Sequence, residues 1–203
     1  MKHVDLPRII ASATARFRFL QDFTGFGDED RKAMTESLLV LGARLSRILD
    51  ELYDHLLSYD DTRQTFLGPA GELDPAYMAQ RKEHLTEWVL MAAASPSLDE
   101  FASYTVKVAS QHLGLQEGAR HRAVPPRYIV ATTSRLQTAL TQALFEELPR
   151  DPTLAMRASL AWNKFLVIHL ELFLSVIAPS WPEWDEASSP AADELRDMAR
   201  AAR

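Results

Sequence analysis

The sequence predicts a single all-α domain, and three observations support this prediction. Apolar residues recur at helical spacing along the chain, whereas no run of strict polar and apolar alternation is long enough to predict a strand. No internal repeat or low-complexity linker divides the chain. Apolar residues make up 47% of the 203 residues, which is enough to bury a sizeable core. The expected organisation is one domain over residues 1–184, followed by a tail over residues 185–203 that is helical or disordered.

The first two helices are predicted over residues 6–19 and 28–58. The second starts after Gly27, where three acidic residues suit the positive end of a helix dipole. Its apolar residues alternate steps of four and three, which places them on one stripe. They are Met34, Leu38, Leu41, Leu45, Ile48, Leu52 and Leu56. This stripe predicts one long helix, or two helices that bend near Gly42.

Four more helices are predicted over residues 75–94, 98–114, 126–148 and 152–177. Asp74 and Asp151 each precede a proline, so each is a capping acid before a proline at the first helical position. The segment from Ser97 to Glu100 has the pattern of a capping box. Pro126 follows another proline and opens the next helix.

Composition excludes several classes of function. The chain has 28 acidic and 22 basic residues, and this excess of negative charge argues against nucleic-acid binding. It has no cysteine, so disulfides, thiolate catalysis, iron–sulfur clusters and cysteine-based zinc sites are excluded. The N-terminus lacks the apolar core of a signal peptide. The apolar segment 165–178 is interrupted by His169 and Glu171 and is shorter than a membrane span of roughly 20 residues. We therefore expect a cytoplasmic protein that does not bind a membrane.

The six histidines are the natural candidates for chemistry in a cysteine-free helical chain. Four of them are interpreted as solvated: His3, His55, His84 and His121. His169 lies among leucines and Phe173. The favoured interpretation is a core or interface histidine with a hydrogen-bond partner, and metal ligation is the alternative.

His112 is the strongest candidate. It shares the apolar face of the 98–114 helix with Phe101, Tyr104, Val108 and other apolar residues. A neutral imidazole on such a face needs a hydrogen-bond partner or a metal. No second ligand lies at the HxxxH or ExxH spacing of a protein-built metal site. A lone histidine suits haem, since the porphyrin supplies the other four nitrogens. Periodicity alone still favours a core histidine with a hydrogen-bond partner.

Tyr53 is the second candidate. It follows Leu52 near the end of the long helix and could face the same cavity as His112. A hydroxyl in an apolar pocket is a good donor to a bound diatomic ligand. The pattern alone favours a packed tyrosine with its hydroxyl at the surface.

Six segments resemble, in order, those of protoglobins and of the globin domains of globin-coupled sensors: FTGFGDEDRKAM, ELYDHLLSYDDTRQTFLG, YMAQRKEHLTEWVL, VASQHLG, VPPRYIVA and AWNKFLVIHLELFL. The resemblance extends from about Phe19 to Trp181. It implies a globin fold of this type with an extra N-terminal helix.

The resemblance also implies roles for particular residues. His112 falls at the proximal ligand and Tyr53 at a distal tyrosine that hydrogen-bonds the ligand. Leu85 falls where a side chain packs over the iron, and Trp88 at the pocket wall. The full set expected to contact the cofactor is His112, Tyr53, Leu85, Trp88, Val108, Tyr128 and Ile129. Arg81 stands where vertebrate globins place a distal histidine, so His84 is not expected in that role.

The function implied is reversible binding of O2, CO or NO at a pentacoordinate haem b (iron protoporphyrin IX), as a gas sensor or carrier. Peroxidase or carbene-transfer activity would be incidental, so the protein is not expected to be an enzyme. A homodimer through the last two long helices is also implied. One alternative is a haem-free globin-like signalling module. Another is a helical regulator unrelated to globins, which should contain a DNA-binding helix pair that the sequence does not indicate.

Overall fold

The computed structural model describes residues 6–68, 70–94, 98–112 and 124–177. These ranges are helical, with no strand beyond an isolated bridge between Leu67 and Leu73. The all-α prediction is therefore confirmed for the described part of the chain. The elements are α1 (Leu6–Thr24), α2 (Asp28–Leu57), α3 (Asp60–Arg63), the 3-10 turn η1 (Gln64–Phe66), α4 (Pro75–Ala93), α5 (Leu98–His112), α6 (Pro126–Glu147) and α7 (Pro152–Ile177). The expected tail over 185–203, the capping residue Ser97, and His3 and His121 lie outside the described residues.

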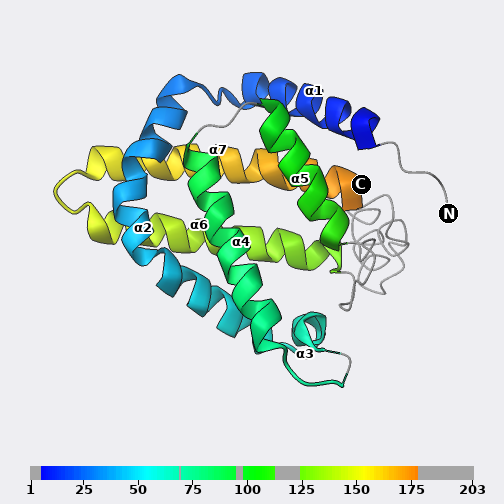
Figure 1. The fold of residues 1–203 in the computed structure, drawn as a ribbon. Coiled ribbons are helices and arrows are strands. Elements are labelled where there is room, and N and C mark those ends of the chain that lie inside the picture. The colour runs from blue at the N-terminus through cyan, green and yellow to red at the C-terminus, as the bar shows by residue number, and fades with distance from the viewer. Residues whose placement is uncertain (1–5, 69, 95–97, 113–123, 178–203) are drawn as a thin grey trace, which may run out of the picture.

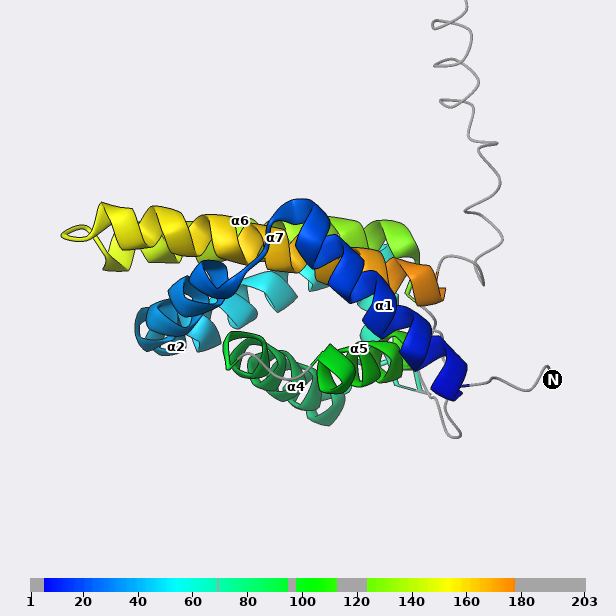
Figure 2. The ribbon, with the colours of Figure 1, turned by 90° about the horizontal axis from the view of Figure 1, so that it is seen from above.

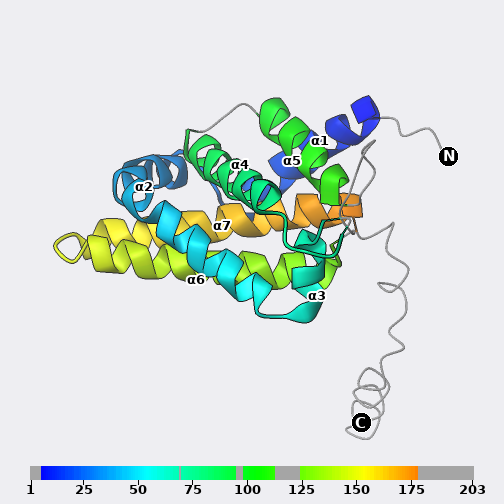
Figure 3. The ribbon, with the colours of Figure 1, turned by 60° about the horizontal axis from the view of Figure 1, so that its bottom comes forward.

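The helices form two layers joined by crossing helices. α6 and α7 lie side by side as one layer, and α4 and α5 form the other (Figures 1 and 2). α2 packs against α4, α6 and α7, whereas α1 packs against α5 and α7. Figure 3 shows that the short helix α3 lies next to the N-terminal end of α6. Among the described helices, all except α1 contribute residues to one interior space.

The apolar stripe predicted for the long helix is its buried face. Met34, Leu41 and Leu45 are buried, as are Ile48 and Leu52 further along α2. The helix is continuous from Asp28 to Leu57, so Gly42 lies inside one helix rather than between two. Leu52 of this stripe directly precedes Tyr53, and Leu56 at its end lines the cavity described below.

Two predicted helix starts are confirmed in atomic detail. The Asp74 carboxylate accepts a hydrogen bond of 3.0 Å from the backbone N–H of Tyr77, with Pro75 in the first turn of α4. The Asp151 carboxylate accepts one of 2.9 Å from the backbone N–H of Leu154 in α7. Each bond satisfies a backbone donor that the helix itself leaves without a partner.

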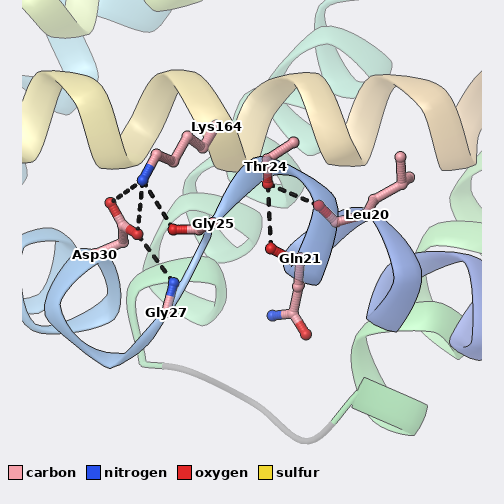
Figure 4. Close-up of polar contacts among 7 residues, drawn as sticks. All are labelled: Leu20, Gln21, Thr24, Gly25, Gly27, Asp30 and Lys164. Carbon is pink, nitrogen blue, oxygen red and sulfur yellow. Dashed lines mark hydrogen bonds and ion pairs between the residues drawn. The ribbon is translucent and has the colours of Figure 1, made fainter.

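The corner between α1 and α2 is bound to α7 by one lysine (Figure 4). Gly25 has φ +65°, a left-handed conformation that glycine adopts without steric cost. Lys164 Nζ lies 2.9 Å from the Gly25 carbonyl oxygen and 3.0 Å from an Asp30 carboxylate oxygen. Asp30 also accepts a hydrogen bond from the backbone N–H of Gly27, at 2.9 Å. Lys164 therefore bonds to both sides of the turn.

Two expectations for the first third of the chain were incomplete. The N-terminal helix was predicted to end at residue 19, but α1 continues to Thr24, whose hydroxyl donates to the Leu20 carbonyl oxygen at 2.7 Å. The short elements α3 and η1 were not predicted. Thr62 donates to the carbonyl oxygen of Leu56, and Thr65 donates to that of Thr62 at 2.7 Å. These bonds stabilise a turn too short to show any apolar periodicity.

α7 is the most apolar part of the core. Trp162 and Phe165 are buried at its centre, and the Trp162 indole donates to the Ser37 hydroxyl at 3.1 Å. Among the described helices, α7 alone is long and apolar enough to cross a membrane by length and composition. Helices α1, α2, α5 and α6 all pack against it, as the sequence interpretation of a buried helix expected.

Candidate functional site

A cavity of about 230 Å³ lies between the two layers of helices. Its walls come from α2, α3, η1, α4, α5, α6 and α7. All seven residues that the sequence singled out border it: Tyr53, Leu85, Trp88, Val108, His112, Tyr128 and Ile129. The structure therefore brings these residues together at one place, although they come from four different helices.

The imidazole of His112 has a fixed orientation at the end of α5. Its Nδ1 lies 2.9 Å from the carbonyl oxygen of Val108, one turn earlier in the same helix. A carbonyl oxygen only accepts, so Nδ1 carries the proton and Nε2 keeps its lone pair. No described residue donates a hydrogen bond to Nε2. The ring is thus prepared to give a lone pair to an electrophile or metal in the cavity.

Apolar groups surround this ring. Phe173 of α7 contacts it edge-on, with ring centroids 4.9 Å apart. Ile129 packs with Phe173 and Ala109 in a small apolar cluster behind the ring. Burial among these groups lowers the pKa of His112, and only the hydrogen bond to Val108 opposes this. A neutral imidazole is the form that binds a metal.

Tyr53 reaches the cavity from the end of α2. Its side chain is buried and contacts Phe66 edge-on, with ring centroids 5.7 Å apart. Burial is the main reason that the pKa of its hydroxyl is raised, although the charge of Arg81 opposes the shift. Within the described residues, no protein group makes a hydrogen bond with this hydroxyl. Tyr53 is therefore packed, as the pattern favoured, and its side chain also lines the cavity.

Leu85 and Trp88 border the cavity from α4. Leu85 is half-buried, and Trp88 is buried against Phe165 and His169, with ring centroids 5.9 and 4.8 Å away. The Trp88 indole nitrogen is buried with no hydrogen-bond partner. An aromatic wall of this kind suits a flat apolar ligand.

Tyr128 and Ile129 lie in the first turn of α6. The Tyr128 hydroxyl donates to the Asp61 carboxylate at 2.6 Å, and this bond joins α6 to α3. Ile129 packs in the apolar cluster with Phe173, whose ring contacts His112, whereas the hydroxyl of Tyr128 points to the surface segment α3.

Two other histidines border the cavity. His169 lies among aromatic rings of α4, α5 and α7, and its Nδ1 is 3.4 Å from the Thr105 hydroxyl. Burial lowers its pKa to about 3. The favoured interpretation of a core histidine with a hydrogen-bond partner agrees with this position. His84 was expected to be solvated, and this was wrong: it is half-buried and accepts a hydrogen bond from Arg81 at 2.9 Å.

Sequence reasoning missed most of the remaining lining residues, yet a signal was present. On α4, the cavity face recurs at helical spacing in Tyr77, Arg81, His84, Leu85 and Trp88. A wheel drawn from Trp88 would have found Tyr77 and Arg81. On α5, Gln111 lines the cavity beside Tyr104, which the sequence had already placed on the face of His112. The polar ends of Tyr77, Arg81 and Gln111 concealed their position, because a cavity face need not be uniformly apolar.

The described residues contain no group of three or more histidine, aspartate or glutamate side chains that could hold a metal ion. Three histidines and four tyrosines border the cavity instead, with aromatic and aliphatic surfaces between them. Of the histidines, His112 has its Nδ1 engaged by a backbone carbonyl oxygen, which leaves its Nε2 as a single ligand atom. This donor set suits a flat cofactor that brings most of the metal's ligands with it.

Comparisons with known proteins give a consistent result. The family model described as Protoglobin matches residues 13–179. Among solved structures, the chain is similar to the globin domain of the Geobacter sulfurreducens globin-coupled sensor, at 16% identity and a TM-score of 0.65. That similarity covers 78% of this chain and 95% of the other. No protein of curated function matches the sequence.

Proposed function

Because this chain belongs to the Protoglobin family and has the globin fold, we propose that it binds haem b in the cavity and reversibly binds a diatomic gas there. The observation that supports haem binding most directly is the geometry of His112. Its Nδ1 is engaged by the Val108 carbonyl oxygen, so its Nε2 lone pair is available to the cavity. The role of the protein is that of a gas sensor or carrier rather than an enzyme.

The residues present fit haem. His112 would bind the iron through Nε2, and its bond to Val108 would hold the ring in place and raise its basicity. Val108, Ile129 and Phe173 would exclude water around His112, and Leu85 and Trp88 would supply apolar contacts to the cofactor. Since the chain has no cysteine, no thioether can attach the cofactor, which is compatible with the proposed haem b.

Haem supplies a ferrous iron with an open position for O2, CO or NO. Tyr53 is the residue of this chain placed to act on the bound gas. Its hydroxyl has no other partner among the described residues, and its raised pKa keeps it protonated as a donor. A hydrogen bond from Tyr53 would slow the release of O2, the most polar of these ligands when bound.

The first experiment is the visible spectrum of the purified protein, reduced and then exposed to CO. We expect a Soret band that shifts with CO, and we expect its loss or alteration in His112→Gly. Free imidazole added to His112→Gly should restore the wild-type spectrum, because it can occupy the space of the deleted ring. His55→Gln is the matched control, since His55 lies on α2 against Tyr59, away from the cavity lining.

A colourless protein that ignores added haem would overturn the proposal and favour a haem-free signalling module of the same fold. A coloured His112→Gly protein that ignores imidazole would leave haem binding in place but would remove His112 from the iron. The acid-extracted cofactor identifies its type.

We also propose that residues 1–184 form the globin domain, that the protein is cytoplasmic, and that it forms a homodimer through α6 and α7. Three large apolar side chains on α7 are exposed at helical spacing, namely Met156, Leu160 and Val167. Phe145 of α6 is exposed as well. Burial of such a surface against a second copy is favourable. In light scattering, Leu160→Glu should give a monomer, whereas Leu39→Glu on the exposed side of α2 should not.

A further inference from the structure

The described lining of the cavity carries a single formal charge. It belongs to Arg81 on α4, and no aspartate or glutamate is among the described lining residues. Arg81 is half-buried, and it has one hydrogen bond at the surface, to the Gln80 amide oxygen at 3.4 Å. The guanidinium therefore stands where the cavity meets solvent.

All the described partners of Arg81 are neutral. Its terminal nitrogens lie 2.9 Å from Nδ1 of His84 and 3.5 Å from the amide oxygen of Gln111 on α5. Arginine only donates, so the contacted nitrogen of His84 carries no proton. The ring of Tyr77 lies 5.0 Å from the guanidinium carbon. The Nε–H of Arg81 is buried with no partner at all.

Several other arginines of the described chain have carboxylate partners even where they are more exposed. Arg16 pairs with Glu171, and Arg157 pairs with Glu36 at 3.1 Å. No ion pair of this kind involves Arg81 among the described residues. A half-buried cation that has only neutral partners and one buried unused donor favours an anion, above all a planar carboxylate that can accept two of its bonds.

The deeper cavity has the opposite character. Leu166, Leu170 and Phe173 of α7 line it together with Trp88. A ligand that satisfies the whole cavity therefore has a large apolar body and an acidic group at one edge.

We propose that Arg81, with Gln111 across the opening, forms an anion site that binds a carboxylate of the ligand filling the cavity. The inference rests on the proposed function for the identity of this ligand: with haem bound, the group is a propionate. His84 acts as a positioning residue, since its Nδ1 accepts a hydrogen bond from the guanidinium.

The test compares haem with its dimethyl ester, in which both carboxylates are uncharged. Each is loaded into the wild-type protein, Arg81→Gln, Arg81→Lys and the surface control Arg157→Gln. The rate of transfer to an excess of a haem-free acceptor globin is then measured. We expect wild-type protein and Arg157→Gln to lose the ester at least about tenfold faster than haem, as one charge-assisted contact of about 1.5 kcal/mol or more requires.

In Arg81→Gln, haem loss should accelerate until the two rates approach each other, while ester loss stays unchanged. Arg81→Lys should give an intermediate ratio, because it keeps the charge without the planar fork. Equal acceleration of haem and ester loss in Arg81→Gln would show a merely structural role and would overturn the anion site. Loss rates of haem and ester that both stay at their wild-type values would overturn it as well.

If neither the wild-type protein nor any variant takes up haem, the proposed function fails, but the anion site can still be tested. Calorimetric titrations then use dodecanoate and its methyl ester in place of haem and its dimethyl ester. Binding of dodecanoate that is lost in Arg81→Gln would retain the anion site. No binding of dodecanoate, or equal binding of acid and ester, would overturn it.

Discussion

The hydroxyl of Tyr128 lies 2.6 Å from the carboxylate of Asp61, and this bond joins two walls of the cavity that are 67 residues apart in the chain. Tyr128 lines the cavity from α6, and Thr62, the neighbour of Asp61, lines it from α3. The donor is neutral and the acceptor is charged, which makes the bond stronger than one between neutral groups. It also lies at the surface, where water competes for both partners.

Tyr128→Phe should therefore loosen this side of the cavity with little effect on global stability. We expect a loss of about 1 kcal/mol or less in unfolding free energy, and up to about a fivefold rise in local opening. The bimolecular association rate of CO after flash photolysis should rise accordingly. Asp60→Asn is the matched control on α3, and equal rates in Tyr128→Phe and wild type would show that ligands do not enter between α3 and α6.

Tyr53→Phe should accelerate O2 release. One lost hydrogen bond of roughly 1 kcal/mol corresponds to a rate increase of about five- to tenfold, measured by stopped-flow displacement with CO. The hydroxyl has no described protein partner, so the substitution should leave the unfolding free energy unchanged or slightly higher. Tyr104→Phe is the control, because Tyr104 lines the same cavity but donates to the His84 carbonyl oxygen at 3.4 Å. An O2 release rate like that of the wild type in Tyr53→Phe would remove Tyr53 from the distal role.

The sequence was informative wherever a long helix has one buried face. The stripe from Met34 to Leu52 predicted α2 and its buried face. The acid–proline pairs predicted the starts of α4 and α7, because both act through local backbone donors. Elements that depend on distant parts of the chain were not predictable in this way. α3 and η1 are short turns held by threonine bonds to the backbone, and their residues show no periodicity.

The candidate site was predictable in part. Spacing placed His112 on a buried face, but it could not tell a ligand from a core histidine with a hydrogen-bond partner. The structure explains why, since the partner of Nδ1 is a backbone carbonyl oxygen, which every sequence provides. Family resemblance, not spacing, brought Tyr53, Leu85 and Tyr128 into one set. Arg81 drew notice in the sequence only because it stands where vertebrate globins place a distal histidine. Its lack of a carboxylate partner depends on which side chains lie near it in the folded protein, and spacing along the chain does not reveal them.

Buried neutral histidine should make the protein sensitive to acid. Burial lowers the pKa of His169 to about 3 in the folded protein, whereas the unfolded chain has an ordinary histidine pKa near 6.5. The unfolded state thus binds one more proton between these values, so stability is fully present above about pH 6.5 and falls as the pH is lowered toward 3. The expected slope from this one group is about 1.4 kcal/mol per pH unit.

Urea unfolding at pH 7, 6, 5 and 4 checks this slope against His169→Gln. The amide can still contact Thr105 but does not titrate, so the variant should lose stability less steeply than the wild type by about 1.4 kcal/mol per pH unit. Parallel curves for the two proteins would mean that His169 does not remain neutral and buried.

Lys164 should contribute more to stability than an ordinary surface lysine. Its ammonium group contacts the Gly25 carbonyl oxygen and both Asp30 oxygens, and the Asp30 side chain is only 15% exposed. Lys164→Met would leave this largely buried carboxylate with the backbone N–H of Gly27 as its remaining described partner. We expect a loss of about 1–2 kcal/mol in unfolding free energy from urea titration, because a desolvated charge loses its counter-ion. Arg157→Met, which breaks the exposed pair with Glu36, should cost about 0.5 kcal/mol or less. Equal losses in the two variants would show that the corner between α1 and α2 is held by the backbone of Gly25 and its neighbours rather than by Lys164.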